Sequence, residues 1–115
     1  LQALKIGKFF EENDINFTKV LSSEWCRCKD TAKIAFGNYE TKNFLNSFYD
    51  ERFSENKDKQ ILDFQKFIKN WNYSGNLALV THYVVISEIL DLATSSGEIV
   101  ITDNNLKFLG SLEIN

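Results

Sequence analysis

A short, uninterrupted apolar run from Leu77 to Val80 constrains the fold of this chain more than any other feature. Consecutive apolar residues leave a strand without a polar side, which is typical of a strand buried on both faces of a sheet. Helical patterns lie before and after this run. Strands that alternate with helices form layered sheets, so the sequence predicts an α/β protein.

The other patterns place the remaining elements of this fold. Apolar residues at helical spacing predict helices over residues 1–13, 25–36, 60–71 and 85–93. Shorter patterns predict strands over residues 17–22, 98–102 and 106–112, the last two joined as a hairpin. Residues 39–59 are irregular and suggest a loop draped over the surface with a helical turn. The expected fold is a three-layer α/β/α arrangement with a mostly parallel sheet and an antiparallel edge.

The size and charge of the chain exclude several functional classes. Its 115 residues, 43% of them hydrophobic, fit one domain with one core. No apolar run approaches the roughly 18 residues needed to span a bilayer, so no membrane partner is expected. A net charge of −3 argues against a nucleic-acid partner, which would require a basic face.

The cysteines give no sign of a metal site. Cys26 and Cys28 lie two residues apart on a predicted helix, so they point to different faces and cannot pair with each other. They also lack the spacing and the additional ligands of a zinc site. We therefore expect no metal and no cofactor. Unpaired cysteines slightly favour a soluble, cytoplasmic protein.

Polar residues with distinctive chemistry follow two of the predicted strands. Arg27 lies in the segment after residues 17–22, and His82 follows the apolar run. Ligands of open α/β sheets bind at the carboxyl ends of the strands, so neighbouring strands would bring these two residues into one crevice. Ser22 or Ser23 is expected to cap the helix that follows, whose first N–H groups attract anions. The pattern predicts a pocket for a phosphate-like dianion.

Each of these residues also has a simpler interpretation. Arg27 is one of only two arginines among thirteen basic residues, which favours a role in bidentate anion binding that lysine performs poorly. It could instead pair with Glu24 or Asp30 on a solvated helix face. His82, the only histidine of the chain, could be a structural hydrogen-bonding residue at the end of a strand.

The segment from Val20 to Ala32 resembles the strand-to-helix segment of the histidine phosphatase superfamily, which has the phosphoglycerate-mutase-like fold. The shared pattern is a Ser, three variable residues, an Arg and then, after three more residues here, Thr-Ala. Leu79 to His82 resembles the strand that delivers the second histidine of that family, and residues 97–101 resemble its late strand. The resemblance implies that Arg27, His82 and Ser23 bind a phosphoryl group, with Arg27 and His82 as catalytic residues.

The sequence departs from the family pattern at its most important point. The family forms a phosphohistidine on a nucleophilic His in an Arg-His-Gly motif, and this chain has no such motif. The expected domain, residues 1–115, is therefore partial, with its first strand and nucleophile missing from the front. A chain that lacks Met and starts directly with a strong apolar helix fits this interpretation. For the general acid of the family, Asp50 and Glu51 are the candidates.

Two functional classes follow from these observations. The first is the phosphate-binding part of a histidine-phosphatase-like domain, whose intact form would hydrolyse a phosphomonoester or phosphohistidine while the chain as given has little or no activity. The second is a non-catalytic module that binds phosphate or a protein. The expected partner is a phosphorylated small molecule or a phosphate ion. A missing central strand would also leave open sheet edges, which predicts self-association through such an edge.

Overall fold

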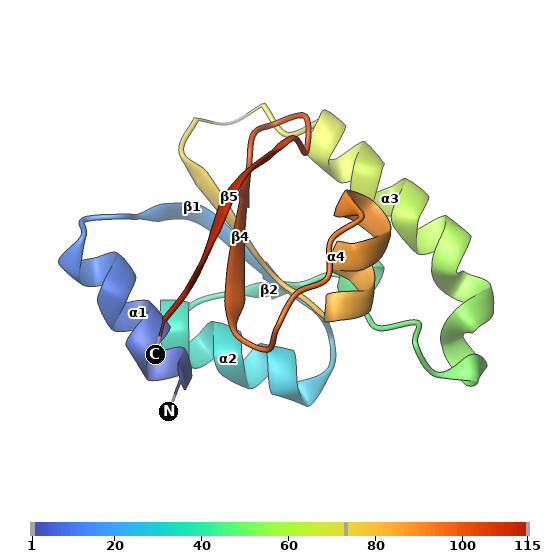
Figure 1. Cartoon of the computed structure of the whole chain (residues 1–115), viewed down its shortest axis with the longest axis horizontal. Helices are drawn as coiled ribbons and strands as arrows, with labels where there is room; N and C mark the ends of the chain where they lie inside the picture. Colours follow the sequence, from blue (N-terminus) through green and yellow to red (C-terminus); the bar gives the residue numbers. More distant parts are fainter. Residues whose placement is uncertain (1, 73, 115) are drawn as a thin grey trace.

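A computed structural model describes residues 2–72 and 74–114 of the chain, without the side chain of Glu51. The helices are α1 (Gln2–Glu12), α2 (Cys26–Phe36), α3 (Lys57–Lys69) and α4 (Tyr83–Leu90). The strands are β1 (Phe17–Ser22), β2 (Glu40–Thr41), β3 (Asn76–Val80), β4 (Glu98–Thr102) and β5 (Phe108–Glu113). Two 3₁₀ helices, η1 (Asn43–Leu45) and η2 (Glu51–Asn56), lie between β2 and α3. Helices and strands alternate along most of the chain, and the α/β class is confirmed (Figure 1).

The parallel sheet has the strand order β2-β1-β3. β1 and β3 run side by side, with Leu21 opposite Leu79 and Ser22 opposite Val80. The last two strands pair antiparallel, as predicted. In the described part of the chain, however, they form a separate two-stranded ladder rather than an edge of the parallel sheet. The prediction of one continuous sheet is therefore wrong for these residues.

The apolar run in β3 lies at the edge of the sheet. Among the described residues β3 pairs only with β1, and Ala78 is its only buried residue. With no strand beyond it, β3 is half-buried, so the expectation of a strand buried on both faces is not met. The β4–β5 hairpin passes across the sheet in Figure 1, and Leu106 at its turn packs against the hydrophobic core.

Helices lie on two sides of the parallel sheet (Figure 1). α1 and α2 pack together on one side, where Gly7 approaches the main chain of Ala35 so closely that a Cβ would lie 2.6 Å from its carbonyl oxygen. On the other side, Phe64 of α3 and Val85 of α4 form the core with Leu21 of β1. None of the helices in the described ranges is long and apolar enough to cross a membrane.

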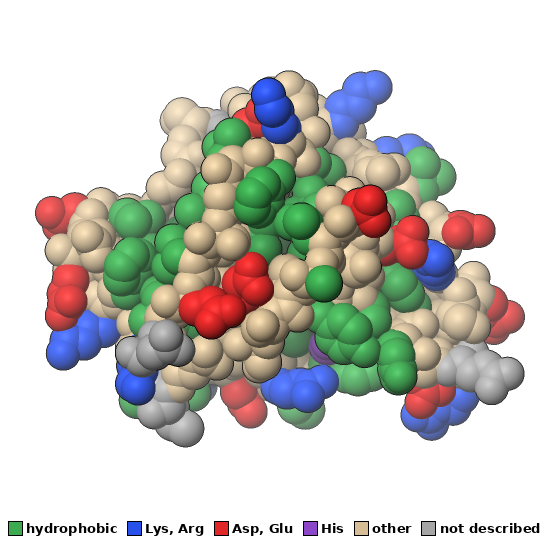
Figure 2. Space-filling view, viewed as in Figure 1, with side chains coloured by type: hydrophobic (Ala, Val, Ile, Leu, Met, Phe, Trp, Pro, Cys, Tyr) green, Lys and Arg blue, Asp and Glu red, His purple; other side chains and the backbone are tan. Residues whose placement is uncertain are grey.

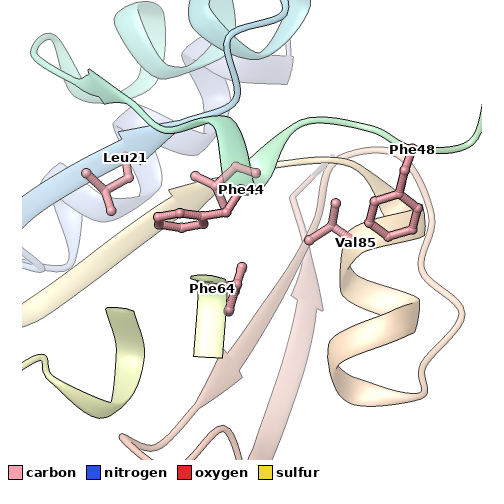
Figure 3. Packing of buried hydrophobic residues seen from close by; sticks show 6 residues of the cluster. Leu21, Phe44, Phe48, Phe64 and Val85 are labelled. Carbon is pink, nitrogen blue, oxygen red and sulfur yellow. The ribbon is translucent and has the colours of Figure 1, made fainter. Parts of the chain in front are cut away.

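The irregular segment before α3 contributes to the core instead of lying on the surface. Phe44, Leu45 and Phe48 are all buried there, with Leu45 fully inaccessible. The Phe44 ring meets the Phe64 ring edge-on, with 5.7 Å between their centroids (Figure 3). The predicted surface loop is therefore wrong, because these side chains fill the space between the sheet and α3.

Most of the predicted boundaries differ from the observed ones by a few residues. β1 has the predicted limits, α3 begins three residues earlier than expected, and α4 ends at Leu90. Asp91 stops α4 by adopting a left-handed conformation with φ of 55°. The cap of α2 also differs from the prediction. Trp25 occupies the N-cap position without a side-chain bond, so neither Ser22 nor Ser23 caps this helix.

Candidate functional site

The carboxyl ends of β1 and β3 lie next to each other, as the site prediction requires. The pairing continues one residue beyond β1, where the N–H of Ser23 donates to the carbonyl of Val80 at 2.9 Å. After β1 the chain runs from Ser23 into α2, and after β3 it runs from Val80 to His82. This parallel register brings Ser23 and His82 into contact, although they are 59 residues apart in the sequence.

His82 is a buried residue with only 8% of its surface exposed. Its Nε2 atom lies 2.9 Å from the hydroxyl oxygen of Ser23 and 3.6 Å from Sγ of Cys28. The indole of Trp25 packs edge-on against the imidazole, with 4.9 Å between the ring centroids. Three residues that follow β1 therefore hold the ring in place.

A polar network extends from Ser23 away from the histidine. The Ser23 hydroxyl donates to Oδ1 of Asn46 at 3.1 Å and accepts from the N–H of Trp25 at 3.1 Å. Asn46 in turn makes two bonds to Glu24, one to its main-chain N–H and one to its carboxylate, both 2.8 Å long. The side chain of Gln60 in α3 donates to the main-chain carbonyl of Asn46 at 2.8 Å. The network thus connects the end of β1 to η1 and α3.

Arg27 lies in the first turn of α2 with its side chain exposed. Among the described residues it forms no salt bridge, so it pairs with neither Glu24 nor Asp30. Its positive charge acts on the histidine. Burial lowers the pKa of His82, and the charge of Arg27 lowers it further. A guanidinium that forms no ion pair with any described residue, and whose charge acts on a neutral imidazole, gives this corner of the molecule a positive charge that can bind an anion.

The thiol of Cys28 is buried in the same cluster, with 5% of the residue exposed. Burial raises the pKa of this thiol, an effect that a bond to Ser23 and the charge of Arg27 oppose. The Sγ atom lies 3.8 Å from the carbonyl oxygen of Thr81. A neutral, enclosed thiol is a poor nucleophile, so Cys28 acts here as a packing and weak hydrogen-bonding group.

Of the two candidate acids, Asp50 and Glu51, the structure describes the side chain of Asp50. The Asp50 carboxylate accepts two bonds from the Arg52 guanidinium, each 3.1 Å, and one of 2.9 Å from its main-chain N–H. The bonds to Arg52 lower the pKa of Asp50, so this carboxyl is ionised at neutral pH and a poor proton donor. The side chain of Glu51 lies outside the described residues.

Sequence reasoning missed three members of the cluster, namely Trp25, Cys28 and Asn46. Trp25 and Cys28 lie in the segment that was singled out, but nothing in their spacing shows which of them faces His82. Asn46 comes from a segment interpreted as a surface loop. The structure places it at the site through the neighbouring Leu45, whose carbonyl accepts a 2.6 Å bond from the hydroxyl of Thr81.

An open hollow of about 540 Å³ lies beside the cluster, between η2, α3 and α4. Tyr83, the chain neighbour of His82, and Ser54 line it, together with Tyr49. Figure 2 shows a small part of the only histidine of the chain, in purple, between a group of hydrophobic side chains and a basic one. In the described residues, no group of three or more His, Cys, Asp or Glu is placed to hold a metal ion.

The sequence matches no protein-family model and no curated protein.

Proposed function

We propose that the crevice at the ends of β1 and β3 binds the phosphoryl group of a phosphomonoester or a free phosphate ion. The observation that carries the proposal is that Arg27 and His82 follow two neighbouring parallel strands, β1 and β3, and that the charge of Arg27 lowers the pKa of His82. In this proposal Arg27 supplies the paired N–H donors that match phosphate geometry. His82 and the first N–H groups of α2 complete the contacts. Ser23 takes part by holding His82 rather than by touching the ligand, because Ser23 is fully buried.

The resemblance to histidine phosphatases extends the proposal to an activity. In the intact form, a nucleophilic histidine would attack phosphorus and form a phosphohistidine, which water would then hydrolyse. This chain holds one histidine, and that histidine is bonded to Ser23 in the crevice. The chain as given therefore binds the phosphoryl group without the group that attacks it, and we expect little or no turnover.

A non-catalytic binding module is the second candidate. The enclosed thiol of Cys28 is a poor nucleophile and the ionised carboxylate of Asp50 is a poor acid, and both properties favour binding over catalysis. An Arg-His-Gly segment upstream in the parent reading frame would favour the enzyme. The same crevice contacts serve both candidates.

Calorimetric titration with inorganic phosphate tests the proposal. Arg27→Lys keeps the charge but loses the planar fork, and we expect its phosphate affinity to fall about tenfold, or about 1.4 kcal/mol. Arg52→Lys is the matched control, because Arg52 is already paired with Asp50 and should not contribute. Equal affinity in the wild type and in both variants would refute the proposed role of Arg27.

A phosphatase assay with a small aryl phosphate tests the missing nucleophile. We expect no turnover above background from the chain as given. Robust turnover that His82→Gln abolishes would show that the chain carries its own nucleophile, and the partial-domain interpretation would then be wrong.

A further inference from the structure

The hydrogen bonds around His82 determine which of its ring nitrogens carries the proton. Glu24 fixes the direction of the Asn46 amide. The Glu24 N–H donates to Oδ1 of Asn46, and the Glu24 carboxylate accepts from Nδ2. Rotating the amide by 180° would place two donors together and two acceptors together, so both contacts would become repulsive. Oδ1 is therefore the atom that faces Ser23.

The hydroxyl of Ser23 has one proton to donate. Oδ1 of Asn46 can only accept, so at 3.1 Å the hydroxyl gives its proton to that atom. The N–H of Trp25 donates to one lone pair of the Ser23 oxygen. The other lone pair faces Nε2 of His82 at 2.9 Å, and this contact is a hydrogen bond only when Nε2 carries a proton. The thiol of Cys28, 3.6 Å from Nε2, donates its own proton to the carbonyl of Thr81, so it too can only accept from Nε2.

We infer that Asn46 is a positioning residue that acts through Ser23 to hold His82 as the Nε2–H tautomer. Nδ1 is then the nitrogen with a free lone pair. The described residues offer Nδ1 no hydrogen bond, and none of their fully buried side-chain nitrogen or oxygen atoms lacks a partner. Nδ1 therefore reaches solvent, and a ligand in the crevice meets it as a proton acceptor.

The charges around the imidazole agree with a neutral ring. α2 contributes the positive Arg27 and the neutral Cys28, and both burial and Arg27 lower the pKa of His82. The carboxylate of Glu24 accepts a hydrogen bond from the amide of Asn46. η2, whose Phe53 packs on Trp25, contributes Asp50 and Arg52, which pair with each other. In α4, Glu88 pairs with Lys57 at 2.7 Å.

This arrangement specifies the protonation state of the ligand, a conclusion that rests on the proposed phosphate function. A phosphomonoester loses its second proton with a pKa of about 6, so at pH 7.5 it is mainly a dianion. A bare phosphoryl oxygen would face the lone pair of Nδ1 and be repelled. Binding should therefore take up about one proton from solvent, shared between a phosphoryl oxygen and Nδ1, with no bond to phosphorus formed or broken.

The tautomer is measured by long-range ¹H–¹⁵N correlation of the full chain at pH 8, where the imidazole is neutral. One histidine gives one set of ring signals, so the assignment is unambiguous. We expect the wild type to show a protonated Nε2 and an unprotonated Nδ1. An Nδ1–H spectrum in the wild type would overturn the inference, even if every variant failed to fold.

Asn46→Leu tests the role of the amide itself. Without Oδ1 the Ser23 hydroxyl is free to donate to Nε2, so we expect the proton of the imidazole to move toward Nδ1. Asn43→Leu, at an exposed position in η1, is the control and should leave the wild-type spectrum. A folded Asn46→Leu protein with an unchanged tautomer would overturn the positioning role.

Titration of inorganic phosphate in two buffers of different ionisation enthalpy measures the proton count. We expect a net proton uptake at pH 7.5 that is below one proton per phosphate, because inorganic phosphate, unlike a monoester, is already partly a monoanion at this pH. Binding without proton uptake would overturn the acceptor role of Nδ1. Failure of phosphate to bind at all would refute the proposed function, whereas the tautomer spectrum would still decide the inference about Asn46.

Discussion

Replacing Leu45 by alanine tests whether the irregular segment before α3 supports the site. Leu45 is fully buried in the core between the sheet and α3. Its carbonyl accepts a hydrogen bond from Thr81, and the side chain of the adjacent Asn46 accepts one from Ser23. Truncating a buried leucine costs about 2–5 kcal/mol, and a fully enclosed side chain justifies about 3 kcal/mol. For a domain of this length the melting temperature should fall by about 10 °C.

Urea unfolding followed by circular dichroism measures this loss directly. Leu62→Ala in α3 is the matched control, since 53% of Leu62 is exposed, and it should change the free energy of unfolding by less than about 0.5 kcal/mol. If Leu45→Ala cost no more than Leu62→Ala, the segment would be a surface loop. The contacts that place Asn46 beside Ser23 would then have no structural support.

Three further predictions follow from packing, titration and the open strands. Gly7→Ala should destabilise the fold by about 1–3 kcal/mol in urea unfolding, because its Cβ would meet the Ala35 carbonyl. Gly110→Ala is the control, since a Cβ there would have no atom within 4 Å, and it should cost less than about 1 kcal/mol. Equal effects would contradict the close packing of α1 on α2. The free energy of unfolding should decrease as the pH falls below about 6.5, because His82 binds a proton more readily in the unfolded chain than in the folded one. His82→Gln should flatten this decrease. A wild type whose free energy of unfolding does not change between pH 7.5 and 5.5 would contradict the prediction. The outer side of β3 pairs with no other strand among the described residues, and Phe108 and Leu109 of the hairpin are exposed, so we expect self-association that sedimentation detects. Leu109→Lys should weaken this association. A monomer at all concentrations would disprove the prediction.

The parts of the fold that the sequence predicted are those with strong local patterns. β1, α1 and the β4–β5 hairpin have apolar residues at regular spacing, bounded by turn residues, and they form close to the predicted limits. The site prediction depended on β1 and β3 being neighbours, and the structure meets that condition. Arg27 and His82 could therefore be expected in one crevice.

The parts that the sequence did not predict depend on contacts between distant residues. Phe44 and Phe48 have no regular spacing, and they are buried because α3 and α4 supply a surface for them. β2 has only two residues, both exposed, and forms by pairing with β1. Asn46 joins the site through bonds to residues more than twenty positions away, which no local pattern reveals.

The NMR signals of His82 test the proposed phosphate site most sharply. Inorganic phosphate is titrated into the ¹⁵N-labelled protein while the ring resonances of His82 are followed. We expect a saturable shift of these resonances in the wild type and in Arg52→Lys, and a curve displaced to about tenfold higher phosphate in Arg27→Lys. Resonances that do not move with phosphate, or that move equally in all three proteins, would contradict a phosphate site built on Arg27 and His82.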